Sequence, residues 1–483
     1  MKELPDGWQH ALLGDLGVWR GGGTPSKSQA SFWGGTIPWV SPKDMKTDLI
    51  VETEDHITSE AVARSSTQMV PAGSILVVTR SGILRRLFPV AVASRAVAIN
   101  QDIKALTPYE GVEAEFVARQ LRALSSSILS QCAKSGTTVD SVDFERLKNY
   151  QIALVPELEQ RRIVAKLDSL FARTRRARAE LSHIPRLIEN YKKAILEAAF
   201  RGDLTRDWRS LSFARDPVFP RDADAIKKKY RGSSEMAFSP PYTMPNEWGW
   251  FRLPELGELD RGKSKHRPRN DRTLYGGDFP FVQTGEVREA TRYLRYYSKT
   301  YNYKGLSQSR LWPVGTVCIT IAANIAETAI LDIDACFPDS VVGFIADKDR
   351  VSNSYVEFFL RTMKDDLEAF APATAQKNIN LDTLSSVYVP VPPLNEQMEI
   401  VNRIEKAMDW LKIVEEEQGH AMHLLDRLDQ ANLAKAFRGE LVPQDPNDEP
   451  ASVLLERICA ARAEQPKNTR KGRGKTANAR VAA

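Results

Sequence analysis

One short run of this sequence has the residue types of a reaction centre that transfers a methyl group to an amine. Ser239, Pro240, Pro241 and Tyr242 follow one another. In such a centre the polar residue and a neighbouring backbone carbonyl bind the amine, and the aromatic ring stacks on a flipped base. The reaction also needs a glycine-rich loop after a strand to hold the methyl donor, and we find none. The run lies in a stretch with the composition of a linker, so a catalytic role is not favoured.

Two other patterns could bind a metal ion. Asp6 with residues 44–46 (Asp-Met-Lys) could be matched to a nuclease's metal-binding pattern, but such short matches are frequent by chance. His420 and His423 have helical spacing, and without a third ligand they are more typical of a helix surface. The four cysteines include no Cys-x-x-Cys pair, which argues against a zinc site and a disulfide framework. The sequence therefore predicts neither a catalytic residue nor a metal site.

A basic loop gives the strongest chemical signal, and the chemistry is recognition of DNA. Basic side chains crowd residues 261–272, together with Gly, Pro and a single Asp. Lysine and arginine bind phosphate, and arginine also reads guanine through two hydrogen bonds. A solvated run of charges is the alternative. The candidate DNA contacts of this loop are Lys263, Lys265, Arg267, Arg269 and Arg272.

Weaker candidates lie in two other loops. One set follows a predicted strand at a Gly turn. The other precedes a predicted strand near residue 390. The first set is Arg80, Arg85 and Arg86, and the second is Gln376, Lys377 and Asn378. Arginine could bind phosphate or guanine, and the second set could pair with adenine or phosphate.

The elements that position these loops are repeated in the chain. Residues 159–164 (Glu-Gln-Arg-Arg-Ile-Val) return 237 positions later as 396–401 (Glu-Gln-Met-Glu-Ile-Val). Residues 199–204 (Ala-Phe-Arg-Gly-Asp-Leu) return at the same offset as 436–441 (Ala-Phe-Arg-Gly-Glu-Leu). Between these motifs, apolar residues alternate steps of four and three, which predicts a long helix with one buried seam in each copy.

The two long helices should pack on each other through their seams. Repeats related by a pseudo-two-fold axis make like elements run in opposite directions, so we expect an antiparallel coiled coil. Pro185 should kink the first helix and Gly419 the second.

The chain is therefore predicted to be a tandem repeat of the α+β class, in which two mixed α/β domains are separated by the long helices. β-branched runs at 74–79, 90–99, 316–321 and 341–345 predict strands, and amphipathic patterns at 114–130 and 354–370 predict helices. The predicted boundaries are 1–155 for the first recognition domain, 156–204 for the central spacer helix, 205–245 for a linker, 246–392 for the second recognition domain, 393–443 for the distal spacer helix and 444–483 for a basic, disordered tail.

Composition limits the class of protein. A chain of 483 residues suits two or three domains. It has no apolar run long enough to cross a bilayer and no signal peptide, so a cytoplasmic location is expected. The net charge of +5 comes from residues 462–483, which hold seven basic residues and one Glu, so overall charge is no argument for DNA binding.

At this point the sequence resembles a known family, the DNA-specificity subunits of type I restriction-modification enzymes. Residues 22–26 (Gly-Gly-Thr-Pro-Ser) with Trp33 and 37–39 (Ile-Pro-Trp) resemble the opening motif of that family's target-recognition domains. Residues 159–160 and 200–209 are similar to its central spacer, and the order of domain, spacer, domain, spacer is the more specific signal. The second module departs from the opening motif, because it has the basic loop instead, so its base preference should differ.

The resemblance implies a non-catalytic subunit that reads a split site in double-stranded DNA as part of a cell's defence against foreign DNA. Two methyltransferase subunits would bind its helices, and restriction subunits, which also translocate DNA, would join them. S-adenosylmethionine, ATP and Mg²⁺ would belong to those partners, and no cofactor is expected in this chain. The candidate subunit contacts are Gln160, Arg161, Arg162 and Gln397.

Two other functions stay open at this stage. One is a solitary DNA methyltransferase with a fused recognition region, which the missing donor loop argues against. The other is a coiled-coil scaffold that never binds DNA.

Overall fold

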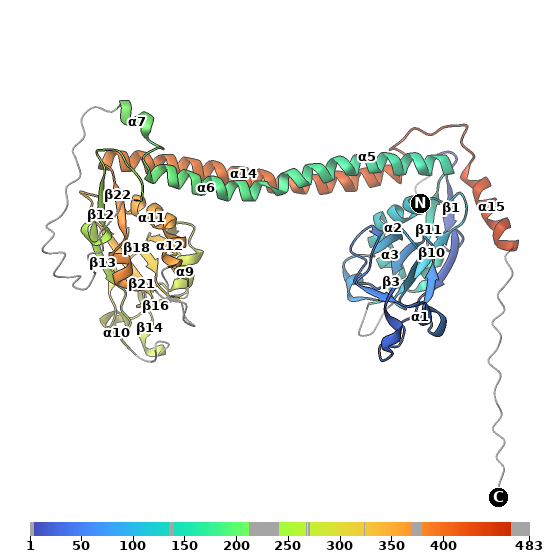
Figure 1. Ribbon diagram of the computed structural model, residues 1–483, viewed down its shortest axis with the longest axis horizontal. Coiled ribbons are helices and arrows are strands. Elements are labelled where there is room, and N and C mark those ends of the chain that lie inside the picture. Colours follow the sequence, from blue (N-terminus) through green and yellow to red (C-terminus); the bar gives the residue numbers. More distant parts are fainter. Residues whose placement is uncertain are drawn as a thin grey trace, which may run out of the picture. The chain divides into compact units, whose positions relative to one another are not determined.

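The computed structural model describes residues 4–134, 140–211, 241–266, 268, 271–322, 324–369 and 379–464 (Figure 1). The chain forms two compact units. Unit 1 combines Met1–Leu181 with His420–Ala483, and unit 2 is Ser182–Gly419. Unit 1 is thus built from both ends of the chain, whereas unit 2 is continuous.

Each unit contains a main sheet with the same strand order. In unit 1 the order is β2 (Gly17–Gly21), β10 (Ile103–Pro108), β7 (Ile75–Val78), β8 (Val90–Ala93) and β4 (Leu49–Ile50). In unit 2 it is β13 (Gly257–Arg261), β21 (Val341–Ala346), β18 (Val317–Thr320), β19 (Thr328–Leu331) and β15 (Tyr293–Leu294). The last strand of each order pairs in parallel with its neighbour, and the other pairs are antiparallel.

A smaller sheet and a two-stranded ribbon are duplicated in the same way. The smaller sheet of unit 1 has the order β5 (Asp55–Ile57), β3 (Trp33–Val40), β9 (Val97–Ile99) and β6 (Gln68–Val70). Its counterpart in unit 2 has the order β16 (Lys299–Tyr301), β14 (Tyr275–Phe281), β20 (Ala335–Cys336) and β17 (Leu311–Trp312). The ribbons are β1 (Gln9–Leu12) with β11 (Gln151–Leu154) and β12 (Gly249–Arg252) with β22 (Tyr388–Val391). The predicted duplication is confirmed strand by strand.

Four short helices of each recognition domain follow the repeat, and the described part of the second domain has one more. Those of unit 1 are α1 (Ser59–Arg64), α2 (Ala114–Ala123), α3 (Ser125–Cys132) and α4 (Phe144–Lys148). Those of unit 2 are α9 (Thr284–Glu289), α10 (Tyr303–Ser307), α11 (Asn353–Thr362), α12 (Lys364–Ala369) and α13 (Leu381–Ser385). The 3-10 turns are η1 (Ala30–Phe32), η2 (Gly82–Arg85), η3 (Leu253–Glu255) and η4 (Arg272–Leu274). The helices predicted at 114–130 and 354–370 are each divided, after Ala123 and after Thr362.

The central strands are buried on both faces, which explains their unbroken apolar sequence. In β7, Ile75 and Val77 pack into one core and Leu76 and Val78 into another, because alternate side chains point to opposite faces of a sheet. The predicted strand at 90–99 is also two strands. β8 joins the main sheet and β9 the smaller one, so a single apolar run supplies both.

The long helices are α5 (Glu157–Ser182), α6 (Ile184–Phe200) and α14 (Leu394–Ala436). The first predicted helix divides at His183, and Pro185 lies in the first turn of α6, where its missing N–H costs no intrahelical bond. Helix α14 continues through Gly419 without a break, and the kink expected there stays a prediction. Nothing lies within 4 Å of a Cβ built there, and a glycine inside an exposed helix costs only about 1 kcal/mol.

Pairing of the long helices is antiparallel within each unit, as predicted. In unit 1, Arg178 near the end of α5 bonds Asp426 and Asp429 of α14, each at 2.7 Å. In unit 2, Tyr191 of α6 packs on Trp410 of α14, with ring centroids 6.1 Å apart. Just beyond the end of α6 the partner comes earlier in α14, since Arg403 donates to the carbonyl of Leu204 at 2.8 Å. Figure 1 shows α6 and α14 side by side.

Two regions assigned to linker and tail contain ordered structure. Residues 206–211 form α7 (Arg206–Leu211), in the first part of the predicted linker. Residues 451–464 form α15 (Ala451–Glu464), so the tail assignment was wrong for this part. Ala451, Leu454 and Ile458 recur at helical spacing and are buried in the core of unit 1, and that burial fixes the helix. Residues 212–240 and 465–483 lie outside the described residues.

Across the described ranges, we find no helix with the length and apolar character needed to cross a membrane.

Candidate nucleic-acid interface and helix junctions

The repeated Glu-Gln pair joins each recognition domain to its long helix. Gln160 is fully buried in unit 1. It accepts a hydrogen bond from the backbone N–H of Glu113 at 2.8 Å and donates to the carbonyls of Gly111 and Val155 at 3.2 and 2.7 Å. These bonds fix the start of α5 to the loop before α2 and to the end of β11.

Gln397 makes the same bonds in unit 2. It is fully buried, accepts from the N–H of Ser352 at 2.9 Å, and donates to the carbonyls of Arg350 and Pro392 at 2.8 and 2.9 Å. Burial removes both glutamines from the surface that a partner subunit could contact. Their role in this structure is to hold each domain to its helix, which differs from the subunit contact that we predicted.

The glutamates of the pair are buried beside a tryptophan. Glu159 accepts from the indole N–H of Trp8, and Glu396 from that of Trp248, both at 3.1 Å. Burial raises the pKa of Glu159, although the bond from Trp8 opposes the shift. Glu396 also binds the guanidinium of Arg209 and accepts from Thr205 at 2.8 Å.

The first junction has no equivalents of the Arg209 and Thr205 side chains that bond to Glu396. At the repeat offset of 237, Val442 and Pro446 stand where unit 2 has Thr205 and Arg209. Within the described part of the chain, Oε1 of Glu159 has no hydrogen-bond partner. The sequence motif gave no sign of this asymmetry, because the residues that create it lie outside the motif.

The second repeated motif ends each helix. Gly202 and Gly439 have φ of +81° and +75°, a left-handed conformation that favours glycine. The N–H groups of Asp203 and Glu440 reach back to the carbonyls of Ala198 and Lys435, each at 2.9 Å.

The phenylalanine of the same motif packs inward. Phe200 contacts the rings of Tyr355 and Phe359 on α11, each at 5.2 Å between centroids. Phe437 contacts the ring of Phe116 on α2 at 5.6 Å. Both repeated motifs therefore attach a long helix to a domain.

We predict that loss of either glutamine loosens one junction only. Gln160→Ala leaves the N–H of Glu113 and two carbonyls without their partner, at a cost of about 1–3 kcal/mol for each buried group left unpaired. The unfolding free energy of unit 1 should fall by about 3 kcal/mol or more. Hydrogen exchange on the full chain should become faster at the amide of Glu113 and stay unchanged at that of Ser352.

Gln397→Ala should give the reverse pattern, so each variant is the control for the other. The exposed Arg161, which pairs with Glu157 at 2.7 Å, should be replaceable by Ala with little effect. Equal changes at both amides in either variant would contradict separate junctions.

Arg162, the remaining predicted subunit contact, is also engaged within unit 1. Its guanidinium binds both oxygens of Asp448, at 3.2 and 2.5 Å, and this pairing raises the pKa of Arg162. Asp448 lies between α14 and α15, so the pair holds the connection to α15. The contact was missed because Asp448 lay in the predicted tail.

In unit 2, part of the predicted DNA loop is described. Lys263 and Lys265 follow β13, and Arg272 begins η4. Lys265 and Arg272 are exposed. The loop is supported by the N–H of His266, which donates to Gln308 at 3.0 Å, and by a 2.8 Å contact between His266 and Asp271. Hydrogen bonds to Asp271 from the N–H of Thr273, from the Thr273 hydroxyl and from His266, in that order of effect, lower the pKa of Asp271 to about 2.

In unit 1 the candidate arginines surround η2. Arg80 pairs with Asp102 at 2.6 Å, and Arg85 pairs with Asp140 at 2.7 Å. Both side chains are more than half exposed, so each could exchange its carboxylate for phosphate. Arg86 is exposed at the end of η2. The other predicted contacts lie outside the described residues, and they are Arg267, Arg269, Gln376, Lys377 and Asn378.

The patterns first considered for catalysis have structural roles where they are described. The Tyr242 ring packs on Trp250, with centroids 5.3 Å apart, and burial raises the pKa of its hydroxyl to about 12. Ser239 and Pro240 lie outside the described residues. Among the residues that are described, no group of three His, Cys, Asp or Glu side chains could hold a metal ion.

Comparison with known proteins defines the class to which this duplicated fold belongs. Residues 5–185 and 245–419 match the model of the type I restriction modification DNA specificity domain, and the chain belongs to this family. The two matched regions coincide with the two copies of the repeat. The chain is therefore a DNA sequence-specificity subunit, and neither a solitary methyltransferase nor a scaffold without DNA is favoured.

Particular relatives support the same assignment. The specificity subunit of the type I restriction enzyme EcoDI from Escherichia coli is 27% identical over 68% of this chain and 72% of its own length. That of StySPI from Salmonella potsdam is 22% identical over 95% of this chain and 96% of its own length. That of EcoR124I/EcoR124II from Escherichia coli is 43% identical, over only 32% of this chain and 39% of its own length.

A solved structure has the same fold. The HsdS subunit from Thermoanaerobacter tengcongensis superimposes with a TM-score of 0.59, at 20% identity, over 91% of this chain and 98% of its own.

Proposed function

We propose that this chain reads a split, asymmetric site in double-stranded DNA, with one half-site for each recognition domain, and performs no chemistry itself. The observation that supports this most strongly is one fold present twice with different surface loops. A repeated scaffold positions two readers, and divergent loops give them different base preferences.

The loop after the first main-sheet strand shows the divergence. In unit 1 it is glycine-rich and closely packed, since a Cβ on Gly23, where unit 2 has Lys263, would lie 2.5 Å from the carbonyl carbon of Ser66. The indole N–H of Trp39 also donates to the carbonyl of Gly23 at 3.1 Å. In unit 2 the corresponding strand β13 leads into the basic loop. The two loops cannot present the same contacts to base edges.

The paired helices offer a surface for partner proteins in both repeats. Leu187 and Tyr191 on α6 are exposed, and so are their counterparts 237 positions later, Leu424 and Leu428 on α14. Exposed apolar side chains at matching positions favour one kind of partner bound twice. We propose that each pair is the centre of a dock for a methyltransferase subunit, giving two per chain.

Restriction subunits that also translocate DNA would complete the assembly. In this proposal, S-adenosylmethionine, ATP and Mg²⁺ bind to the partner subunits, and the complex works in the cytoplasm. Half-site centres about one helical turn apart, roughly 34–36 Å, would let both domains enter the major groove on one face of the DNA.

Mapping methylated bases in a host with and without this gene tests the proposal. The methylated sequence should be split and asymmetric, with specified bases on each side of an unread gap, and it should disappear when the gene is removed. Native mass spectrometry of the purified complex should show two methyltransferase subunits for each copy of this chain. A continuous palindrome would contradict two different readers, and a ratio of one to one would contradict the two docks.

A further inference from the structure

A second basic surface in unit 2 is rich in exposed tyrosine. It occupies the segment from the end of β15 to the start of α10, residues 295–304. Tyr296 and Tyr303 are 71% and 79% exposed, and Tyr297 is also exposed. Lys299 and Lys304 are exposed in the same segment. Tyrosine hydroxyls and lysine ammonium groups are common donors to DNA phosphates.

This surface is continuous with the basic loop already assigned to DNA. Lys304 donates to the hydroxyl of Thr273, beside Arg272, at 2.9 Å. The ammonium group of Lys299 lies 5.7 Å from the centre of the Tyr275 ring, which directly follows η4. Ser309, just beyond α10, donates to the carbonyl of Lys263 at 2.8 Å. Residues 295–309 therefore contact the basic loop and the residues that directly follow it.

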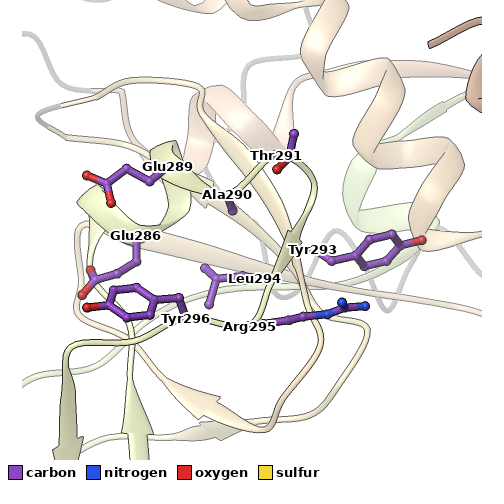
Figure 2. A pocket seen from close by; sticks show the side chains of 8 residues that line it. All are labelled: Glu286, Glu289, Ala290, Thr291, Tyr293, Leu294, Arg295 and Tyr296. Atoms are coloured by element: carbon purple, nitrogen blue, oxygen red, sulfur yellow. The ribbon is translucent and has the colours of Figure 1, made fainter. Parts of the chain in front are cut away.

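Two of the acidic groups near this segment, Glu286 and Asp332, have partners of their own. Tyr296 and Arg295 line a pocket of about 290 Å³ whose other walls include Glu286 and Glu289 (Figure 2). Glu286 accepts from the hydroxyl of Ser298 at 2.6 Å, which helps to lower its pKa against the effect of burial. Arg295 is paired with Asp332 at 2.5 Å. Among the described residues, Lys299 and Lys304 have no carboxylate within salt-bridge distance.

Unit 1 has the opposite charge at the equivalent positions. Strands β5 and β16 hold the same place beside β3 and β14, and Ile57 and Tyr301 occupy the same register. The next residues, Thr58 and Asn302, cap α1 and α10 in the same way. By this register, Asp55 corresponds to Lys299, and Glu60 to Lys304.

We propose that Lys299 and Lys304, with the hydroxyls of Tyr296, Tyr297 and Tyr303, form a second contact of unit 2 with the phosphate backbone of DNA. Unit 1 has no such contact, because it lacks these lysines and has Asp55 and Glu60 in their places, with Glu60 already paired with Arg64 at 3.0 Å. The inference rests on the proposed function and adds that the two domains contribute unequally to salt-dependent affinity.

Salt dependence of DNA binding tests the contact directly. The complex of this chain with its methyltransferase partner is titrated with a duplex that carries the mapped site and with an unrelated duplex, between 50 and 200 mM salt. For Lys299→Gln with Lys304→Gln, the slope of log K against log salt should become shallower by about 1.8, because each phosphate contact contributes about 0.9. The ratio of the two affinities should change little, since phosphate contacts do not read sequence.

Two further variants sharpen the test. Lys299→Asp with Lys304→Glu installs the residues of unit 1 and should weaken binding to both duplexes more than the glutamine pair does. Lys348→Gln removes an exposed lysine of unit 2 in the turn after β21, close to the Gln397 junction, and should leave the slope unchanged.

An unchanged slope in both Lys299 and Lys304 variants would overturn the inference. So would loss of the methyltransferase from these variants in native mass spectrometry, because the segment would then be a protein interface. Neither result affects the proposed function, which stands on methylation of a split site by the wild-type complex.

Discussion

Exchanging residues 246–392 for the corresponding segment of a relative that reads another sequence should change one half of the methylated site and leave the other half unaltered. Each base pair that no longer matches costs about 1–3 kcal/mol, so the original half-site should be lost from the methylation map entirely. Sequencing of methylated DNA from cells that carry the chimaera measures both halves at once.

The structure shows why such an exchange should fold. The segment keeps β12 and β22 together, and it contributes Trp248, the partner of Glu396. Gln397 of the recipient bonds to backbone atoms of residues 350 and 352, which any donor sequence supplies. The control exchanges residues 1–155 and should alter only the other half. A change in both halves after either exchange would show that the domains do not read independently.

The second large effect concerns the two proposed docks, which differ in chemistry. Beside Leu187 and Tyr191, α14 exposes Trp410 and Ile413, which are 56% and 57% accessible. Beside Leu424 and Leu428, the counterparts on α5 are Arg173 and Arg176, both exposed. A buried tryptophan often costs 2 kcal/mol or more when removed from an interface. The methyltransferase should therefore bind the dock of unit 2 more tightly.

Trp410→Arg with Ile413→Arg converts the dock of unit 2 to the residues of unit 1. We expect about 30-fold weaker binding of the tighter methyltransferase subunit, which corresponds to about 2 kcal/mol. Binding isotherms should change from two unequal steps to two similar ones. The matched variant, Arg173→Trp with Arg176→Ile, should strengthen the weaker step. Unchanged isotherms in both variants would place the docks elsewhere.

Sequence alone predicted the elements that rest on repetition and periodicity. The motifs at 159–164 and 199–204 were recognised because they recur at one offset, and the structure shows that both attach a helix to a domain. The repeat alone did not show which side chains of these motifs are buried. Gln160 was predicted to be a subunit contact because its motif is repeated on the second helix, although its side chain lies fully inside unit 1.

Other differences have equally local causes. Helix α15 was assigned to a disordered tail because the basic composition of residues 462–483 outweighed the spacing of Leu454 and Ile458. The surface around Lys299 and Lys304 was missed because its significance depends on which residues of unit 1 stand in the same place. Only the strand register pairs them with Asp55 and Glu60.

The division of unit 1 between the two ends of the chain sets an order for its folding during synthesis. Unit 2 is continuous from residue 182 to 419 and can complete its contacts as soon as its own segment has left the ribosome. The apolar side chains of α5 cannot pack fully until residues 420–464 have been made, and these follow the 238 residues of unit 2. At about 5–20 residues per second, synthesis of residues 182–464 takes roughly 14–57 s. Throughout it, Ile163 and Leu167 lack part of the core that finally buries them, so the nascent first domain depends on the last residues of the chain to become complete.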